Sequence, residues 1–225
     1  MPVPLRDRRE AGRRLAAELA SYADRSDVLV LALPRGGVPV GFELAHRLRV
    51  PLDVFVVRKL GVPGHEELAM GAIASGGVRV INRELVQHLG ISAADINRVT
   101  ELETRELERR ERAYRGGRTP ASVRGRTILL VDDGLATGST MRAAVEALRL
   151  QAPAGIIVAA GVGAPQACAE LSVVANGCVC AVQPLSLDGV GRWYADFSQT
   201  TDAEVRDLLE RASREWPSPA APSTP

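Results

Sequence analysis

Five short apolar runs along the chain predict the strands of one sheet. They span residues 28–33, 54–57, 128–131, 156–160 and 178–182. Each run is continuously apolar rather than alternating, which is typical of strands buried on both faces of a parallel sheet. We therefore expect a five-stranded, mainly parallel sheet as the core of an α/β fold.

Helical periodicity fills the segments between several of these runs. Apolar residues recur at spacings of three and four after the first and third runs, at Val38, Phe42, Ala45 and Leu48 and at Met141, Ala144, Val145 and Leu148. Strands that alternate with helices of this length form βαβ units, so helices should flank the sheet.

Three more helices are predicted outside these units. Residues 5–22 form a candidate first helix. Two patterns resemble capping boxes, Ser92 with Asp95 and Thr201 with Glu204. The first opens a long, highly charged helix that ends near Tyr114, and its mixed charges predict a solvated face or a dimer contact. We expect a single domain over residues 1–215, with a core at about 25–200, and a disordered tail at 216–225.

Composition narrows the class of protein. The 225 residues are 46% hydrophobic, and 28 basic residues nearly cancel 27 acidic ones to give a net charge of +1. This balance argues against a nucleic-acid partner or an anionic membrane surface, since either favours a basic excess. No apolar run approaches the ~20 residues of a membrane span. The N-terminus also lacks the apolar core of a signal peptide, so we expect a cytoplasmic protein.

The strongest chemical signal lies at residues 128–140. A buried strand runs into two adjacent acids, Asp132 and Asp133, and a loop of small residues then leads into a helix. Backbone N–H groups at a helix N-terminus favour a phosphate, and paired carboxylates can accept hydrogen bonds from sugar hydroxyls. This order of strand, acids, loop and helix predicts a site for a phosphorylated sugar.

These residues resemble the phosphoribosyl pyrophosphate (PRPP) motif of type I phosphoribosyltransferases. The resemblance implies that Asp132 and Asp133 hold the ribose 2- and 3-hydroxyls and contact Mg²⁺ indirectly, through those hydroxyls or water. It also implies a loop that binds the 5-phosphate, formed by Ala136, Thr137, Gly138, Ser139 and Thr140. The implied protein is a homodimeric pentosyltransferase of nucleotide metabolism with Mg²⁺ as cofactor.

Two further segments support this resemblance. Residues 33–37 end the first strand, and Arg35, Gly36 and Gly37 look like the family's pyrophosphate loop, where a non-proline cis peptide is typical. Residues 57–71 are similar to the mobile catalytic loop of adenine and orotate phosphoribosyltransferases, with Arg58 and His65 as substrate contacts and Lys59 as a catalytic cation.

Lys59 is the single lysine among the basic residues. Glycines and Pro63 predict that the surrounding segment is an irregular lid until a ligand orders it. Adenine enzymes carry a Glu-Tyr pair where Ala69 and Met70 stand here, which puts adenine specificity in doubt. Glu66 or Glu67 could substitute, or could simply be exposed.

Residues 184–199 fall where family members place a hood over the acceptor base. Trp193, Tyr194 and Phe197 lie within five positions and could stack on a flat base, or could plug the space beside the last helix. Nothing in this segment distinguishes a purine, a pyrimidine or a non-base amine as acceptor.

Three cysteines, an odd number, argue against a disulfide framework. Cys178 and Cys180 alternate on the fifth predicted strand, and we interpret them as core residues. With Cys168 and distant histidines they do not show the spacing of a zinc site.

The most consistent function is transfer of ribose-5-phosphate from PRPP to a nitrogenous acceptor, such as a nucleobase, with release of pyrophosphate. A non-catalytic regulator that binds PRPP or a nucleotide on the same fold is the alternative. A phosphoribosyl hydrolase, or an exchange activity with water or phosphate as acceptor, is a second one.

Overall fold

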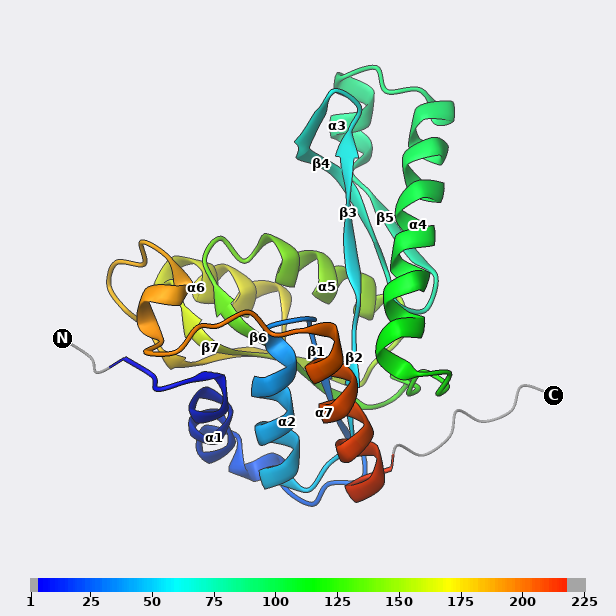
Figure 1. The fold of residues 1–225 in the computed structure, drawn as a ribbon. Helices are drawn as coiled ribbons and strands as arrows, with labels where there is room; N and C mark the ends of the chain where they lie inside the picture. The colour runs from blue at the N-terminus through cyan, green and yellow to red at the C-terminus, as the bar shows by residue number, and fades with distance from the viewer. Residues whose placement is uncertain (1–3, 218–225) are drawn as a thin grey trace.

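The computed structural model describes residues 4–217 and consists of a layered core with a projecting arm (Figure 1). Residues 218–225, which are most of the predicted tail, lie outside the described part of the chain. Within the described part, no helix combines the length and the apolar character needed to cross a bilayer.

The core is a five-stranded parallel sheet, as predicted. Its strands are β1 (Val28–Ala32), β2 (Leu52–Val54), β6 (Thr127–Leu135), β7 (Gly155–Gly163) and β8 (Gly177–Val182). They are ordered β2-β1-β6-β7-β8, and all neighbours pair in parallel. Continuous burial of β1 explains why its sequence shows no alternation.

Helices cover both faces of this sheet and create two apolar clusters. The helices α1 (Arg8–Glu18), α2 (Gly37–Leu48) and α7 (Asp202–Glu215) lie on one face, and α5 (Ser139–Arg149) and α6 (Pro165–Val174) lie on the other (Figure 1). The predicted helix at 5–22 is shorter than expected. It begins at Arg8, and the Asp7 side chain caps its N-terminus by accepting a hydrogen bond from the Glu10 N–H. A 3-10 turn at Ala20–Tyr22 follows the helix.

The arm is the main departure from the prediction. It contains a three-stranded antiparallel sheet, β3 (Val57–Val62), β4 (His65–Ala74) and β5 (Val78–Ile81), with α3 (Arg83–His88) and the predicted charged helix α4 (Ala93–Arg115) (Figure 1).

The run at 54–57 is therefore not one strand, because the chain leaves the core sheet after Val54 and enters the arm at Val57. The expected irregular lid at 59–71 is also wrong. Leu60 and Val62 are buried, so the segment has a packed face and forms a hairpin. Gly64, with φ of 78°, makes the turn after Pro63.

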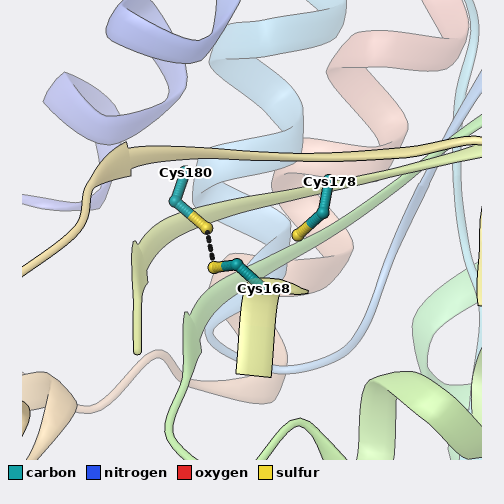
Figure 2. Close-up of side chains that lie close together, drawn as sticks. All are labelled: Cys168, Cys178 and Cys180. Atoms are coloured by element: carbon teal, nitrogen blue, oxygen red, sulfur yellow. Dashed lines mark hydrogen bonds between the residues drawn. The ribbon is translucent and has the colours of Figure 1, made fainter. Parts of the chain in front are cut away.

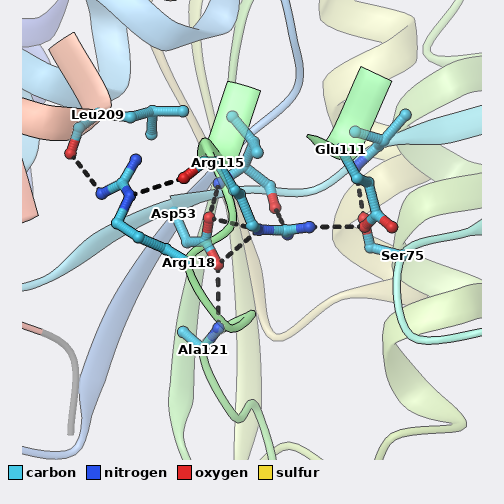
Figure 3. A network of polar contacts seen from close by, with 9 residues as sticks. Asp53, Ser75, Glu111, Arg115, Arg118, Ala121 and Leu209 are labelled. Carbon is cyan, nitrogen blue, oxygen red and sulfur yellow. Dashed lines mark hydrogen bonds and ion pairs between the residues drawn. The ribbon is translucent and has the colours of Figure 1, made fainter. Parts of the chain in front are cut away.

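A buried ion pair anchors the arm to the core at the end of α4 (Figure 3). Arg115 is 6% exposed, and its Nε donates to Asp53 Oδ1 on β2 at 3.0 Å. Its two terminal nitrogens donate to Glu111 and to the Val54 carbonyl, both at 2.7 Å. The Ala121 N–H adds a further bond to Asp53 at 3.0 Å. These bonds compensate two charges that burial alone would penalise.

Candidate functional site

The candidate site lies where the strand order of the sheet reverses. The chain continues from β1 into α2 on one face and from β6 into α5 on the other face. Pairing between β1 and β6 ends at Ala32 with Val131, whereas β6 pairs with β7 as far as Leu135. Asp132 and Asp133 therefore lie beyond the end of β1, at the kind of crevice where open α/β sheets bind ligands.

The glycine loop between β1 and α2 packs directly against these acids. A Cβ at Gly36 would overlap the Asp133 carboxylate, and one at Gly37 would lie 2.6 Å from the Val131 carbonyl oxygen and 3.0 Å from Asp132 Cα. Only glycine permits this approach. The peptide bond between Pro34 and Arg35 is cis, as the resemblance implies.

Two residues from distant parts of the chain hold Asp133 in place. Arg8, at the start of α1, donates from Nε to Asp133 Oδ2 at 2.8 Å, and the hydroxyl of Tyr194 donates to the Asp133 carbonyl at 2.7 Å. Sequence reasoning missed the role of Arg8, because 125 residues separate it from Asp133 and no local motif marks it.

Asp132 occupies the less favourable position for a charge. Its Oδ1 accepts a 2.8 Å bond from the Asp133 N–H. Burial, and then the adjacent Asp133 carboxylate, raise the pKa of Asp132 well above its ordinary value of 3.8. Perturbed carboxyl pKa values cluster at functional sites, so Asp132 is a candidate functional acid.

The expected phosphate loop follows β6 and opens α5. Gly138 adopts φ of 71° and precedes the first helical residue, Ser139. The Thr137 and Ser139 hydroxyl oxygens lie 3.2 Å apart, and they belong to a loop that faces solvent. Hydroxyls, small residues and a helix N-terminus together suit an anion.

A cavity of about 490 Å³ joins this loop to the arm. Thr137, Ser139 and Arg142 line one side of it. Ala69 lines the other side with Val80, Ile81 and nearby residues of β4 and β5. Met70, the second residue of the substituted Glu-Tyr pair, is fully buried instead. The loop and the arm therefore enclose one space with a polar side and a largely apolar side.

The remaining predicted contacts are distributed over the arm and α7. Arg58 pairs with Glu103 of α4 at 2.6 Å, and Lys59 donates to the Glu67 carbonyl at 3.1 Å. His65 is exposed at the start of β4. Arg35 lies 3.6 Å from Asp202 at the start of α7. The structure thus brings Gly36, Gly37 and the acids together, while Arg58, Lys59 and Arg35 face other partners and His65 faces solvent.

The aromatic segment packs differently from the expected hood. Tyr194 is 5% exposed, so its ring is not available to stack on a base, and its hydroxyl positions Asp133 instead. Phe197 stacks on Tyr194 at 5.1 Å and lies under the Arg8 guanidinium at 4.0 Å. Trp193 packs against the core. Trp193 and Tyr194 therefore form a plug, as the alternative proposed, but it lies against β6, β7 and the N-terminal residue Leu5 rather than beside the last helix.

The fold and the position of this site are typical of the open α/β class of proteins, in which the ligand crevice lies at the switch point of a parallel sheet. Residues 5–180 match the family profile described as a phosphoribosyl transferase domain. The chain belongs to this family.

Two relatives place the chain more closely. A protein of Mycobacterium tuberculosis strain H37Rv, provisionally named a phosphoribosyl transferase (Rv0571c), is 43% identical over 210 residues, or 93% of this chain. The match covers 47% of that protein, so the chain spans about half the length of the curated relative. The crystal structure of TT1426 from Thermus thermophilus is similar at 38% identity and a TM-score of 0.83, covering 93% of this chain and 99% of that one.

Proposed function

We propose that this protein transfers the 5-phosphoribosyl group of PRPP to a nitrogenous acceptor, such as a nucleobase, and releases pyrophosphate. One observation carries the proposal: Gly36 and Gly37 pack without side chains against Asp132 and Asp133, beside the loop at 136–140. This arrangement offers carboxylates to a diol and backbone N–H groups to phosphates within one crevice.

Each part of the site has a role in this reaction. Asp132 and Asp133 orient the ribose through its two hydroxyls, and the loop residues bind the 5-phosphate. As the bond at carbon 1 breaks, the ring gains oxocarbenium character and the pyrophosphate gains charge. The protein stabilises these charges and positions the reactants rather than forming a covalent intermediate.

The site also suits Mg²⁺. Two partly buried carboxylates side by side supply the hard oxygen donors that Mg²⁺ prefers, and Asp133 keeps a defined orientation through Arg8. Asp132 and Asp133 would hold the ion through the ribose hydroxyls or water, and the ion would neutralise the leaving pyrophosphate.

The acceptor is expected in the cavity between the loop and the arm. Its volume of about 490 Å³ falls within the range of small-molecule sites. The wall formed by Ala69, Val80 and Ile81 offers apolar contact without the Glu-Tyr pair of adenine enzymes. We therefore expect a flat nitrogenous acceptor in this cavity, and the absence of the Glu-Tyr pair argues against adenine.

A pyrophosphate-release assay tests the function. The protein is incubated with PRPP, Mg²⁺ and a panel of purines, pyrimidines and amines, with a no-acceptor arm and a phosphate arm. We expect release that depends on one class of nitrogenous acceptor. Release without any acceptor, or with phosphate alone, would instead indicate hydrolysis or exchange. PRPP binding without release in every arm would favour the non-catalytic regulator.

A further inference from the structure

The three cysteines of the chain converge on one point behind the phosphate loop (Figure 2). Their sulfur atoms all lie within 4.8 Å of one another, and the Cys168 and Cys180 sulfurs are 2.8 Å apart. Within residues 4–217 this is the one such grouping of three Cys, His, Asp or Glu ligand atoms. The spacing of the cysteines along the sequence did not predict this cluster, because the cysteines come together only where α6 packs against β8.

The local structure explains the convergence. Cys178 and Cys180 are two residues apart on β8, so both side chains point to the same face of the sheet. Cys168 lies on α6, which packs on that face. Gly163 of β7 lies beneath them, and a Cβ there would overlap the sulfurs of both Cys168 and Cys180. The fold thus leaves room for the thiols at a position where a larger residue would exclude them.

From this geometry we infer that Cys168, Cys178 and Cys180 form a binding site for one thiophilic divalent d¹⁰ cation, such as Zn²⁺. Three sulfurs bound to one zinc ion at ~2.3 Å lie about 3.8–4.0 Å from one another. The Cys168 and Cys180 sulfurs are closer than this, and no two of the three sulfurs are more than 4.8 Å apart, so a change of about 1 Å in the Cys168–Cys180 separation would bring that pair to the distance that zinc requires. A water molecule would complete a tetrahedral set.

The position of β8 leaves a route by which an ion can enter the cluster. Cys168 is 4% exposed, while Cys178 and Cys180 are only half-buried on β8, the edge strand of the sheet. An ion can therefore reach the sulfurs from the edge, and its binding would release the thiol protons.

The site lies next to the phosphate loop but does not depend on the proposed reaction. A Cβ at Gly138 would lie 3.2 Å from the Leu171 side chain and 3.5 Å from that of Ala167, both on α6. A bound ion would therefore tie α6 to β8 directly behind the loop. Binding is measured without PRPP, so failure of this inference and failure of the transferase assignment are separate results.

The test is a Zn²⁺ titration of the reduced protein in competition with a chromophoric chelator, with Cd²⁺ as the spectroscopic probe. We expect one Zn²⁺ per chain and a cadmium–thiolate charge-transfer band. All cysteines of the chain are in the cluster, so this band can report no other site.

Single variants Cys168→Ser, Cys178→Ser and Cys180→Ser should each weaken binding by at least ~100-fold. The control His46→Ala with His88→Ala removes two exposed imidazoles elsewhere and should leave the affinity unchanged. Absence of the charge-transfer band, or Zn²⁺ affinity that survives all three serine substitutions, would overturn the site. The site would also be overturned if the protein bound no metal in its reduced form and formed a Cys168–Cys180 disulfide when exposed to air.

Discussion

Replacing Gly36 with alanine should weaken PRPP binding and lower the stability of the fold by a comparable free energy. Gly36 has φ of −61° and ψ of −31°, which alanine adopts readily. The new Cβ would overlap the Asp133 carboxylate, so that side chain must move. Moving it breaks the 2.8 Å bond from Arg8, in a pair whose side chains are 12% and 17% exposed.

The magnitude follows from these contacts. A hydrogen bond between charged groups contributes ~1.5–3 kcal/mol. Replacing glycine with alanine at a position of compatible backbone geometry stabilises the folded state by ~0.4–1 kcal/mol, because it lowers the conformational entropy of the unfolded chain. The net loss in the free energy of unfolding should therefore be about 0.5–2.6 kcal/mol, measured by urea denaturation. PRPP affinity, measured by calorimetry with Mg²⁺, should fall by at least ~10-fold, because a displaced carboxylate no longer meets the ribose.

Gly155→Ala is the matched control for this variant. It introduces the same methyl group at the start of β7, where the nearest atom is 3.5 Å away, and should leave PRPP affinity unchanged. If Gly36→Ala binds PRPP as tightly as the wild type, the close approach of the glycine loop to Asp133 has no role in binding.

Three further predictions concern other parts of the structure. Arg115→Met should lower the free energy of unfolding by ~3–5 kcal/mol in urea denaturation, because it leaves the buried Asp53 without its partner. The double variant Arg115→Met with Asp53→Asn should recover part of this loss. If the single and double variants lose the same free energy, the ion-pair account is contradicted. Lys59→Ala should lower kcat by at least ~10-fold with a much smaller change in PRPP affinity, and Lys59→Arg should also be impaired; wild-type turnover would remove the catalytic role of this lysine. Asp132→Asn should stabilise the fold near pH 7, because the raised pKa makes the ionised carboxylate unfavourable there. This advantage should shrink as the pH falls through the raised pKa towards 3.8, so a pH-independent difference in unfolding free energy would be the contrary result.

The sequence pattern predicted the core because its strands are buried on both faces and therefore read as continuous apolar runs. The structure extends the third predicted strand from Val131 to Leu135, since pairing with β7 continues after pairing with β1 ends. The arm was missed because Pro63 and Gly64 are equally compatible with a mobile loop and with a hairpin turn.

The position of the adjacent acids beside the loop at 136–140 could be predicted because both lie in one continuous segment, and binding of a phosphate there stays a prediction. Arg8, the buried placement of Tyr194 and the cysteine cluster could not be predicted, because tertiary packing alone brings these residues to their partners. The homodimer, the cytoplasmic location and the single-domain boundary at 215 stay predictions.

Calorimetry of PRPP binding to Asp132→Asn with Asp133→Asn tests the central claim most directly. Each carboxylate supplies charged acceptors worth ~1.5–3 kcal/mol, so their joint removal should lower affinity by at least ~100-fold in the presence of Mg²⁺. The control Asp188→Asn with Asp207→Asn removes the same charge from two exposed positions and should bind normally. Unchanged PRPP affinity in the Asp132 and Asp133 double variant, with its fold intact by circular dichroism, would contradict the assignment of this site.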